Sequence, residues 1–151
     1  MMDNTIKDRS FYAEKLSRYL KENHFEEAID TAFIRERAKK AEKTYTENRR
    51  NGDAVLIADE KANSVLMDNL YRSKYNIMTA VMEDNRMPAI IHNFTDLVKQ
   101  SLINECLKIT KDIFKDYPYK EKDFTESQDY DTLYTALTEK VKKYMTEHGI
   151  Q

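Results

Sequence analysis

Glycine and proline are scarce in this chain of 151 residues, with two of each, and tryptophan is absent. Because the tight turns of antiparallel sheets depend on glycine and proline, this composition argues against an all-β fold. Glycine-rich loops that hold phosphate groups are excluded for the same reason. The apolar runs are far shorter than the ~20 residues of a membrane-spanning helix, and the polar start resembles no secretory signal. We therefore expect no contact with a membrane.

The single cysteine, Cys106, cannot form an internal disulfide, which fits a reducing compartment and predicts a cytoplasmic protein. Hydrophobic residues make up 40% of the chain and charged residues 34%, a balance typical of a folded protein. The 25 basic and 27 acidic residues give a net charge of −2. This charge supplies no overall field for binding nucleic acid or anionic lipid.

Apolar residues recur at helical spacing through the first half of the chain. They predict one helix that begins near Ser10 and a second that begins at an Asp30 or Thr31 cap and ends at Gly52. A third helix should begin at Asp53 and form an antiparallel hairpin with the second. The helical spacing of apolar residues is interrupted at residues 71–73, where Ser73 could cap a new short helix. Either a break or a kink of the third helix fits this position.

The second half of the chain has the same helical spacing. An apolar repeat follows Pro88 over residues 88–115, as one helix or two. A polar loop is expected at residues 117–128, and a last helix at residues 129–147. The sequence thus predicts an all-α, single-domain bundle of five to seven helices with no sheet. It would span residues 10–149, after a flexible N-terminus at residues 1–9.

Three segments resemble a known family in their order and spacing. They read FIRERA at residues 33–38, VLMDNLYRSKY at 65–75 and YDTLYTALT at 130–138, followed by EHGI at 147–150. The chain is similar over residues 11–150 to small all-helical proteins of unknown function from Bacteroidetes, often encoded near mobile elements. It departs where Phe25 follows His24 in place of a proline, and residues 87–110 match only in their apolar pattern. The resemblance implies a fold and a genomic setting, but no activity and no functional residue.

Residues that could carry chemistry are dispersed. His24, His92 and His148 lie far apart in the sequence and lack the short spacing of metal ligands. Adjacent carboxylates such as Asp59 and Glu60 point in different directions on a helix and form no ready acid–base pair. We therefore expect no catalytic residue, no metal and no cofactor, and interpret the chain as a protein that is not an enzyme.

The second predicted helix is locally basic. Residues 35–50 hold seven basic and three acidic residues, whereas residues 112–131 hold seven carboxylates and three lysines. The basic candidates for an interaction surface are Arg35, Lys39, Lys43 and Arg50. Three interpretations remain open: a solvated face with internal i, i+4 ion pairs, contact with phosphate, or an acidic protein partner. The basic and acidic regions could also lie against each other, within one chain or between copies.

Two tyrosines, Tyr117 and Tyr119, flank Pro118 in the predicted loop. Aromatic residues in loops are frequent at interfaces, but such rings also pack against their own domain. We interpret the chain as an interaction or accessory module that binds another protein or its own copy. The less favoured alternative is a nucleic-acid-associated accessory protein of a mobile element that uses the basic second helix.

Overall fold

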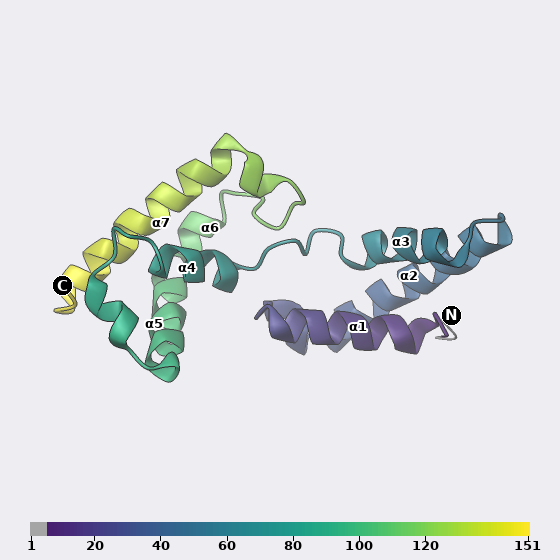
Figure 1. Ribbon diagram of the computed structural model, residues 1–151, viewed down its shortest axis with the longest axis horizontal. Helices are drawn as coiled ribbons and strands as arrows, with labels where there is room; N and C mark the ends of the chain where they lie inside the picture. The colour runs from purple at the N-terminus through teal and green to yellow at the C-terminus, as the bar shows by residue number, and fades with distance from the viewer. Residues whose placement is uncertain (1–5) are drawn as a thin grey trace. The chain divides into compact units, whose positions relative to one another are not determined.

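The computed structural model describes residues 6–151, which form helices joined by turns and loops (Figure 1). These residues contain seven α-helices, three short 3-10 helices and no strand. The all-α class predicted from the sequence is confirmed. The helices gather in two compact units, which we call the N-terminal unit (the described chain up to Asn69) and the C-terminal unit (Leu70–Gln151). Helical periodicity does not predict this boundary, because apolar residues recur on both sides of it.

The N-terminal unit contains helices α1 (Arg9–Glu22), α2 (Thr31–Arg50) and α3 (Val55–Leu66), with a 3-10 turn, η1 (Glu26–Ile29), between α1 and α2. Asp30 caps α2 as predicted, since its Oδ1 accepts a hydrogen bond from the Phe33 backbone N–H at 3.0 Å. Gly52 follows α2 with φ 98°, a left-handed conformation suited to glycine.

The expected cap of the third helix is wrong. Helix α3 begins at Val55 after Ala54, not at Asp53, and no side chain caps its first turn. The Asp53 carboxylate instead accepts a hydrogen bond from Lys61 Nζ at 2.8 Å. Asp53 therefore holds α3 by an ion pair along the helix and not through its terminal N–H groups.

Alanines form the contact between α2 and α3. Ala38 and Ala41 of α2, and Ala58 and Ala62 of α3, are completely buried. Helix α1 completes the core with larger buried side chains, among them Tyr12, whose hydroxyl donates a hydrogen bond to Asp59 Oδ1 at 2.8 Å. Small side chains at a helix contact let the two backbones approach closely, so this core depends on a tight fit.

Residues 1–9 were expected to be flexible, and residues 1–5 lie outside the described part. The rest of this segment is anchored to the N-terminal unit. Lys7 Nζ lies 3.8 Å from Asp59 Oδ2, and the Asp8 carboxylate caps α1. The Arg9 backbone N–H donates to Glu42 Oε2 at 2.6 Å. The start of α1 is thus tied to both other helices of the unit.

The C-terminal unit begins with α4 (Lys74–Met82), whose cap is Ser73 as predicted. Ser73 Oγ accepts a hydrogen bond from the Asn76 backbone N–H at 3.0 Å, so the chain breaks at residues 71–73 and starts a new helix. The repeat at 88–115 divides further, into a 3-10 turn η2 (Ala89–Asn93) and helices α5 (Asp96–Ile109) and α6 (Lys111–Phe114). Pro88 precedes the 3-10 turn and does not begin an α-helix.

The predicted polar loop contains a buried anchor. A 3-10 turn, η3 (Phe124–Glu126), lies inside residues 117–128, and Phe124 is buried in the core of the unit. Helix α7 (Gln128–Glu147) then agrees with the predicted last helix, and Gly149 follows it with φ 74°. Large residues from all these elements form the core, including Met78, Phe114 and Leu137.

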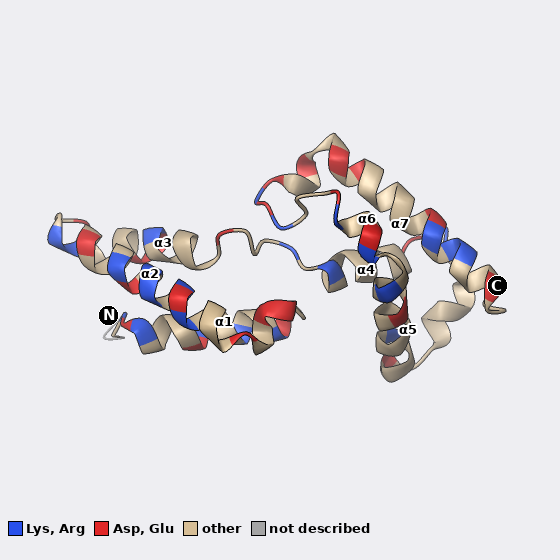
Figure 2. Cartoon of the chain, turned by 180° about the vertical axis from the view of Figure 1, so that it is seen from behind, with Lys and Arg blue, Asp and Glu red and all other residues tan. Residues whose placement is uncertain are grey.

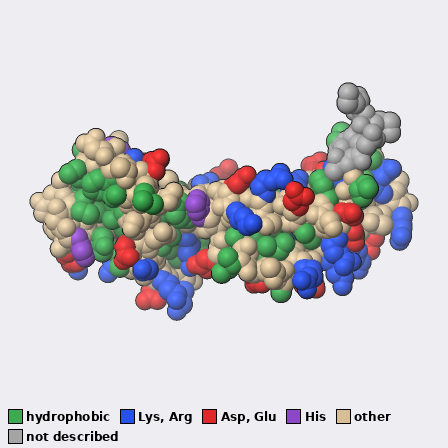
Figure 3. All heavy atoms as spheres, turned by 90° about the horizontal axis from the view of Figure 1, so that it is seen from below, with side chains coloured by type: hydrophobic (Ala, Val, Ile, Leu, Met, Phe, Trp, Pro, Cys, Tyr) green, Lys and Arg blue, Asp and Glu red, His purple; other side chains and the backbone are tan. Residues whose placement is uncertain are grey.

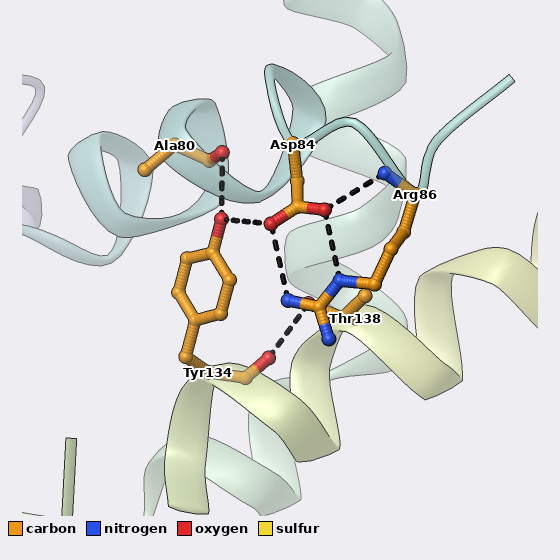
Figure 4. A network of polar contacts seen from close by, with 5 residues as sticks. All are labelled: Ala80, Asp84, Arg86, Tyr134 and Thr138. Carbon is orange, nitrogen blue, oxygen red and sulfur yellow. Dashed lines mark hydrogen bonds and ion pairs between the residues drawn. The ribbon is translucent and has the colours of Figure 1, made fainter. Parts of the chain in front are cut away.

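A polar network joins the turn after α4 to α7 (Figure 4). The Asp84 carboxylate accepts hydrogen bonds from Arg86 Nε at 2.9 Å and from the Tyr134 hydroxyl at 2.9 Å. The same hydroxyl lies 3.1 Å from the Ala80 carbonyl oxygen. Arg86 holds the pKa of Asp84 well below its usual range. Burial, and then the hydrogen bond to Asp84, raise the pKa of Tyr134 to about 12.

Candidate interaction surfaces

The four basic candidates of α2 lie on one exposed face, the basic stripe: Arg35, Lys39, Lys43 and Arg50. At 100° per residue they fall within an arc of about 80°, and they extend over about 22 Å of helix. Figure 2 shows Lys and Arg positions, coloured blue, recurring along the ribbon of α2. The structure thus brings the four residues together as one continuous surface.

Most cations of the basic stripe have no acidic partner. Lys43 Nζ lies 4.0 Å from Glu47, whereas no carboxylate within residues 6–151 lies within ion-pair distance of Arg35, Lys39 or Arg50. Two acidic residues lie at the edges of the stripe: Glu42 is engaged by the start of α1, and Glu36 is exposed. Of the i, i+4 ion pairs expected for a solvated face, the stripe therefore forms one, between Lys43 and Glu47.

Arg37 is also basic and lies on α2, but it has a structural role. Its Nη1 donates hydrogen bonds to the carbonyl oxygens of Leu66 at 3.2 Å and of Asp68 at 2.6 Å, at the C-terminal end of α3. Its guanidinium lies 4.8 Å from the centre of the Phe33 ring. Because free carbonyl groups at a helix end need donors, Arg37 holds α3 against α2 and is not part of the stripe.

The two loop tyrosines pack against the C-terminal unit. Both rings are half-buried, with Tyr119 edge-on to Phe114 at 5.2 Å between centroids and Tyr117 6.3 Å from Phe124. Of the two interpretations of this pair, packing against their own domain is the arrangement that the structure shows. Each ring therefore has only part of its surface available for contact with a partner.

Acidic residues gather on the same unit. We call them the acidic segment, and its exposed carboxylates without an ion pair within residues 6–151 are Asp116, Glu121, Asp123, Glu126, Asp129 and Asp131. A seventh, Asp112, lies 3.9 Å from Lys115. Figure 2 shows Asp and Glu positions, coloured red, in the loop and at the start of α7.

An apolar surface on the C-terminal unit was not predicted from the sequence. Leu97 is 77% exposed, Ile90 47% and Val98 46%. Figure 3 shows hydrophobic side chains gathered on this unit. Of these three residues, Val98 lines an open groove with a volume of about 300 Å³. Its lining consists of Phe94, Val98, Ser101, Leu102, Glu105 and Ile150. We call Ile90, Leu97, Val98 and this groove the apolar surface.

Val98 belongs to the apolar repeat of residues 88–115 together with Phe94 and Leu102, but its side chain is 46% exposed. The chain restarts at the Thr95 cap, so Val98 lies in the first turn of α5, beyond the part of the helix that covers the core.

The histidines and the cysteine are not assembled into a site. Within residues 6–151 no three histidine, cysteine or acidic side chains come together as metal ligands. His148 stacks on the Tyr144 ring with 4.0 Å between centroids. Cys106 is completely buried, and burial raises the pKa of its thiol to about 12, which leaves it inert as a nucleophile.

A smaller pocket of about 60 Å³ lies between α4, η2 and α5, with His92 and Lys99 among its lining residues. It is well below the ~300–1,000 Å³ of typical small-molecule sites. In the described residues, no helix has both the length and the apolar character needed to cross a bilayer.

Comparison with known proteins gives a family and a fold. A family model described as a domain of unknown function (DUF1896) matches residues 4–150. The chain is also similar to the crystal structure of protein PG0816 from Porphyromonas gingivalis, with a TM-score of 0.81 and 26% sequence identity. That similarity covers 95% of this chain and 94% of the other. No curated protein matches the chain. Since the family model spans nearly every residue, the chain belongs to this family of domains of unknown function.

Proposed function

We propose that this protein is a non-enzymatic interaction module of the cytoplasm that works without a cofactor and binds another protein through the apolar surface of its C-terminal unit. The observation that carries this proposal is the exposure of Leu97, Val98 and Ile90 beside an open groove. Contiguous apolar surface rimmed by polar residues is typical of protein-binding sites. The genomic setting that the resemblance implies, near mobile elements, would suit such an accessory protein.

Burial of this surface would supply part of the binding free energy of a specific contact. Complete burial of a Val, Leu or Ile side chain stabilises a complex by about 1.5–3 kcal/mol. The exposed parts of Leu97, Val98 and Ile90 would together contribute a few kcal/mol. A groove can also take one apolar side chain of the partner, which is the geometry of a central interface anchor.

The experiment compares two leucines of almost equal exposure. Leu97 is 77% exposed on the C-terminal unit, and Leu56 is 80% exposed on the N-terminal unit. Wild-type protein, Leu97→Glu and Leu56→Glu serve as baits in a lysate of the native host, with captured proteins identified by mass spectrometry. We expect at least one protein that wild type and Leu56→Glu retain and Leu97→Glu loses, with thermal unfolding unchanged in both variants.

The same three proteins are examined by sedimentation velocity over a concentration series, because the partner could be a second copy. Identical capture by all three baits, together with identical sedimentation, would show that the apolar surface binds nothing. The proposal would then be wrong.

A further inference from the structure

Two surfaces of opposite charge are left without ionic partners in their own units. On α2, the cations Arg35, Lys39 and Arg50 of the basic stripe pair with no carboxylate within residues 6–151. In the C-terminal unit, all six carboxylates of the acidic segment are exposed and pair with no cation in that same described range. Figure 2 shows both groups. The chain therefore carries two exposed surfaces of opposite charge.

The acidic segment is crowded with like charge. Its six carboxylates fall within residues 116–131, where only two lysines, Lys120 and Lys122, accompany them. Asp129 and Asp131 lie in the first turn of α7, where the helix dipole favours negative charge. The other four lie in the loop and in η3 and have no such support. A cationic surface brought against this segment would relieve the repulsion among them.

We infer that the protein self-associates, with the basic stripe of one copy facing the acidic segment of a second copy. In a two-fold symmetric dimer this contact forms twice, so every charge pair counts twice. Exposed charge pairs are weak one by one, and they set orientation and association rate more than affinity. The dimer is therefore weak and sensitive to salt.

An exposed apolar side chain precedes α2, the helix that carries the basic stripe. Ile29 is 92% exposed and lies two residues before α2 begins. A second protein chain can cover such a residue, whereas a phosphate backbone cannot. The whole chain has a net charge of −2 and provides no overall attraction for a nucleic acid. The acidic segment would also repel the phosphate groups of a nucleic acid. These two features favour a second copy over a nucleic acid as the occupant.

The inference is tested by sedimentation equilibrium of the full chain at low and high salt. At low salt we expect the average mass to rise with protein concentration toward that of a dimer. At high salt the rise should disappear, because the Debye length falls from ~30 Å at 0.01 M to ~3 Å at 1 M. A protein that stays monomeric at every concentration in low salt would overturn the inference.

Charge reversal locates the contact. Arg35→Glu with Lys39→Glu should weaken self-association by at least about tenfold, because attraction becomes repulsion at four places in the dimer. The matched control is Lys140→Glu with Lys143→Glu, two exposed lysines of α7, which makes the same change in net charge. Equal weakening by the control would show an effect of net charge alone and contradict the inference.

Rescue makes the test specific. Adding Asp116→Lys and Glu121→Lys to the variant with Arg35→Glu and Lys39→Glu restores opposite charges and should return most of the lost association. Failure of this rescue, with helix content unchanged by circular dichroism, would rule out the proposed contact. A duplex DNA of about 20 base pairs is the last probe. DNA binding that is lost on reversal of Arg35 and Lys39, without self-association, would assign the stripe to nucleic acid and overturn the inference.

This inference does not depend on the apolar surface of the C-terminal unit. Leu97→Glu should leave the salt-sensitive self-association unchanged, whereas reversal of Arg35 and Lys39 should leave capture of a partner through Leu97 unchanged. If Leu97→Glu instead abolishes self-association and the stripe variants do not, the apolar surface is the self-contact. The present inference would then be wrong while the proposed function stands.

Discussion

The N-terminal unit buries alanines in α2 and α3, whereas the C-terminal unit fills its core with methionine, leucine, isoleucine and phenylalanine. In the first core Ala38 of α2 and Ala58 of α3 are completely buried, so a larger side chain at either position would need the helices to move apart. The second core holds bulky side chains such as Phe114 and Met78. The two units should therefore be sensitive to opposite substitutions. A larger side chain in the core should destabilise the N-terminal unit, and a smaller side chain in the core should destabilise the C-terminal unit.

The largest effect is expected from lost volume in the C-terminal unit. Phe114 is buried in that core, with its ring 5.2 Å from the Tyr119 ring. Phe114→Ala should lower the free energy of unfolding by about 3–5 kcal/mol, because the cavity collapses only in part. Urea denaturation followed by circular dichroism measures the loss. A decrease below about 1 kcal/mol would show that Phe114 is not packed as described.

Added volume in the N-terminal unit should have the next largest effect. Ala58→Leu places a larger side chain at the contact between α3 and α2 and should cost about 1–3 kcal/mol through overpacking. Ala32→Leu, on the exposed side of α2, is the matched control and should change stability by no more than about 0.5 kcal/mol. Equal effects of the two substitutions in thermal unfolding would remove the contrast between the units.

A polar contact distinguishes the C-terminal unit further. Tyr134→Phe removes the hydroxyl that Asp84 and Ala80 share and should cost about 1 kcal/mol at neutral pH. The pKa of this hydroxyl is raised to about 12, so its contribution is complete below pH 10 and is lost between pH 10 and 12. Stability curves of wild type and Tyr134→Phe should therefore converge above pH 12. Curves that stay parallel through this range would contradict the assigned hydrogen bond.

The last prediction concerns the reactivity of Cys106 in the wild-type protein and needs no substitution. Because burial raises the pKa of the Cys106 thiol to about 12, almost no thiolate exists at pH 8. The folded protein should react with a disulfide reagent far more slowly than the unfolded chain in guanidinium chloride. Rapid reaction of the folded protein would show that the core of the C-terminal unit opens readily.

Helical periodicity and capping residues predicted much of the fold. The all-α class, the Asp30 and Ser73 caps and the start of the last helix near Asp129 are confirmed, because each depends on local chemistry. The division into two units depends on contacts between distant residues and has no local signal. The buried Phe124 inside a polar loop was missed for the same reason.

The candidate surfaces were predictable to different degrees. The basic stripe follows from helix geometry, since residues 35, 39, 43 and 50 share a face of any straight helix, and the structure keeps that face exposed. The tyrosines of the loop could not be placed, because their packing depends on Phe114 and Phe124. The apolar surface was hidden by a run of apolar residues that looked like one continuous core stripe.

Native-state hydrogen exchange of Phe114→Ala tests most directly the claim that each unit is held by a core of its own. We expect the opening free energies of amides in α4, α5 and α7 to fall by about 3–5 kcal/mol, or to the limit of detection. Amides of α2 and α3 should keep their wild-type protection. An equal fall of protection in both units would contradict the claim, because the chain would then unfold as a single cooperative body.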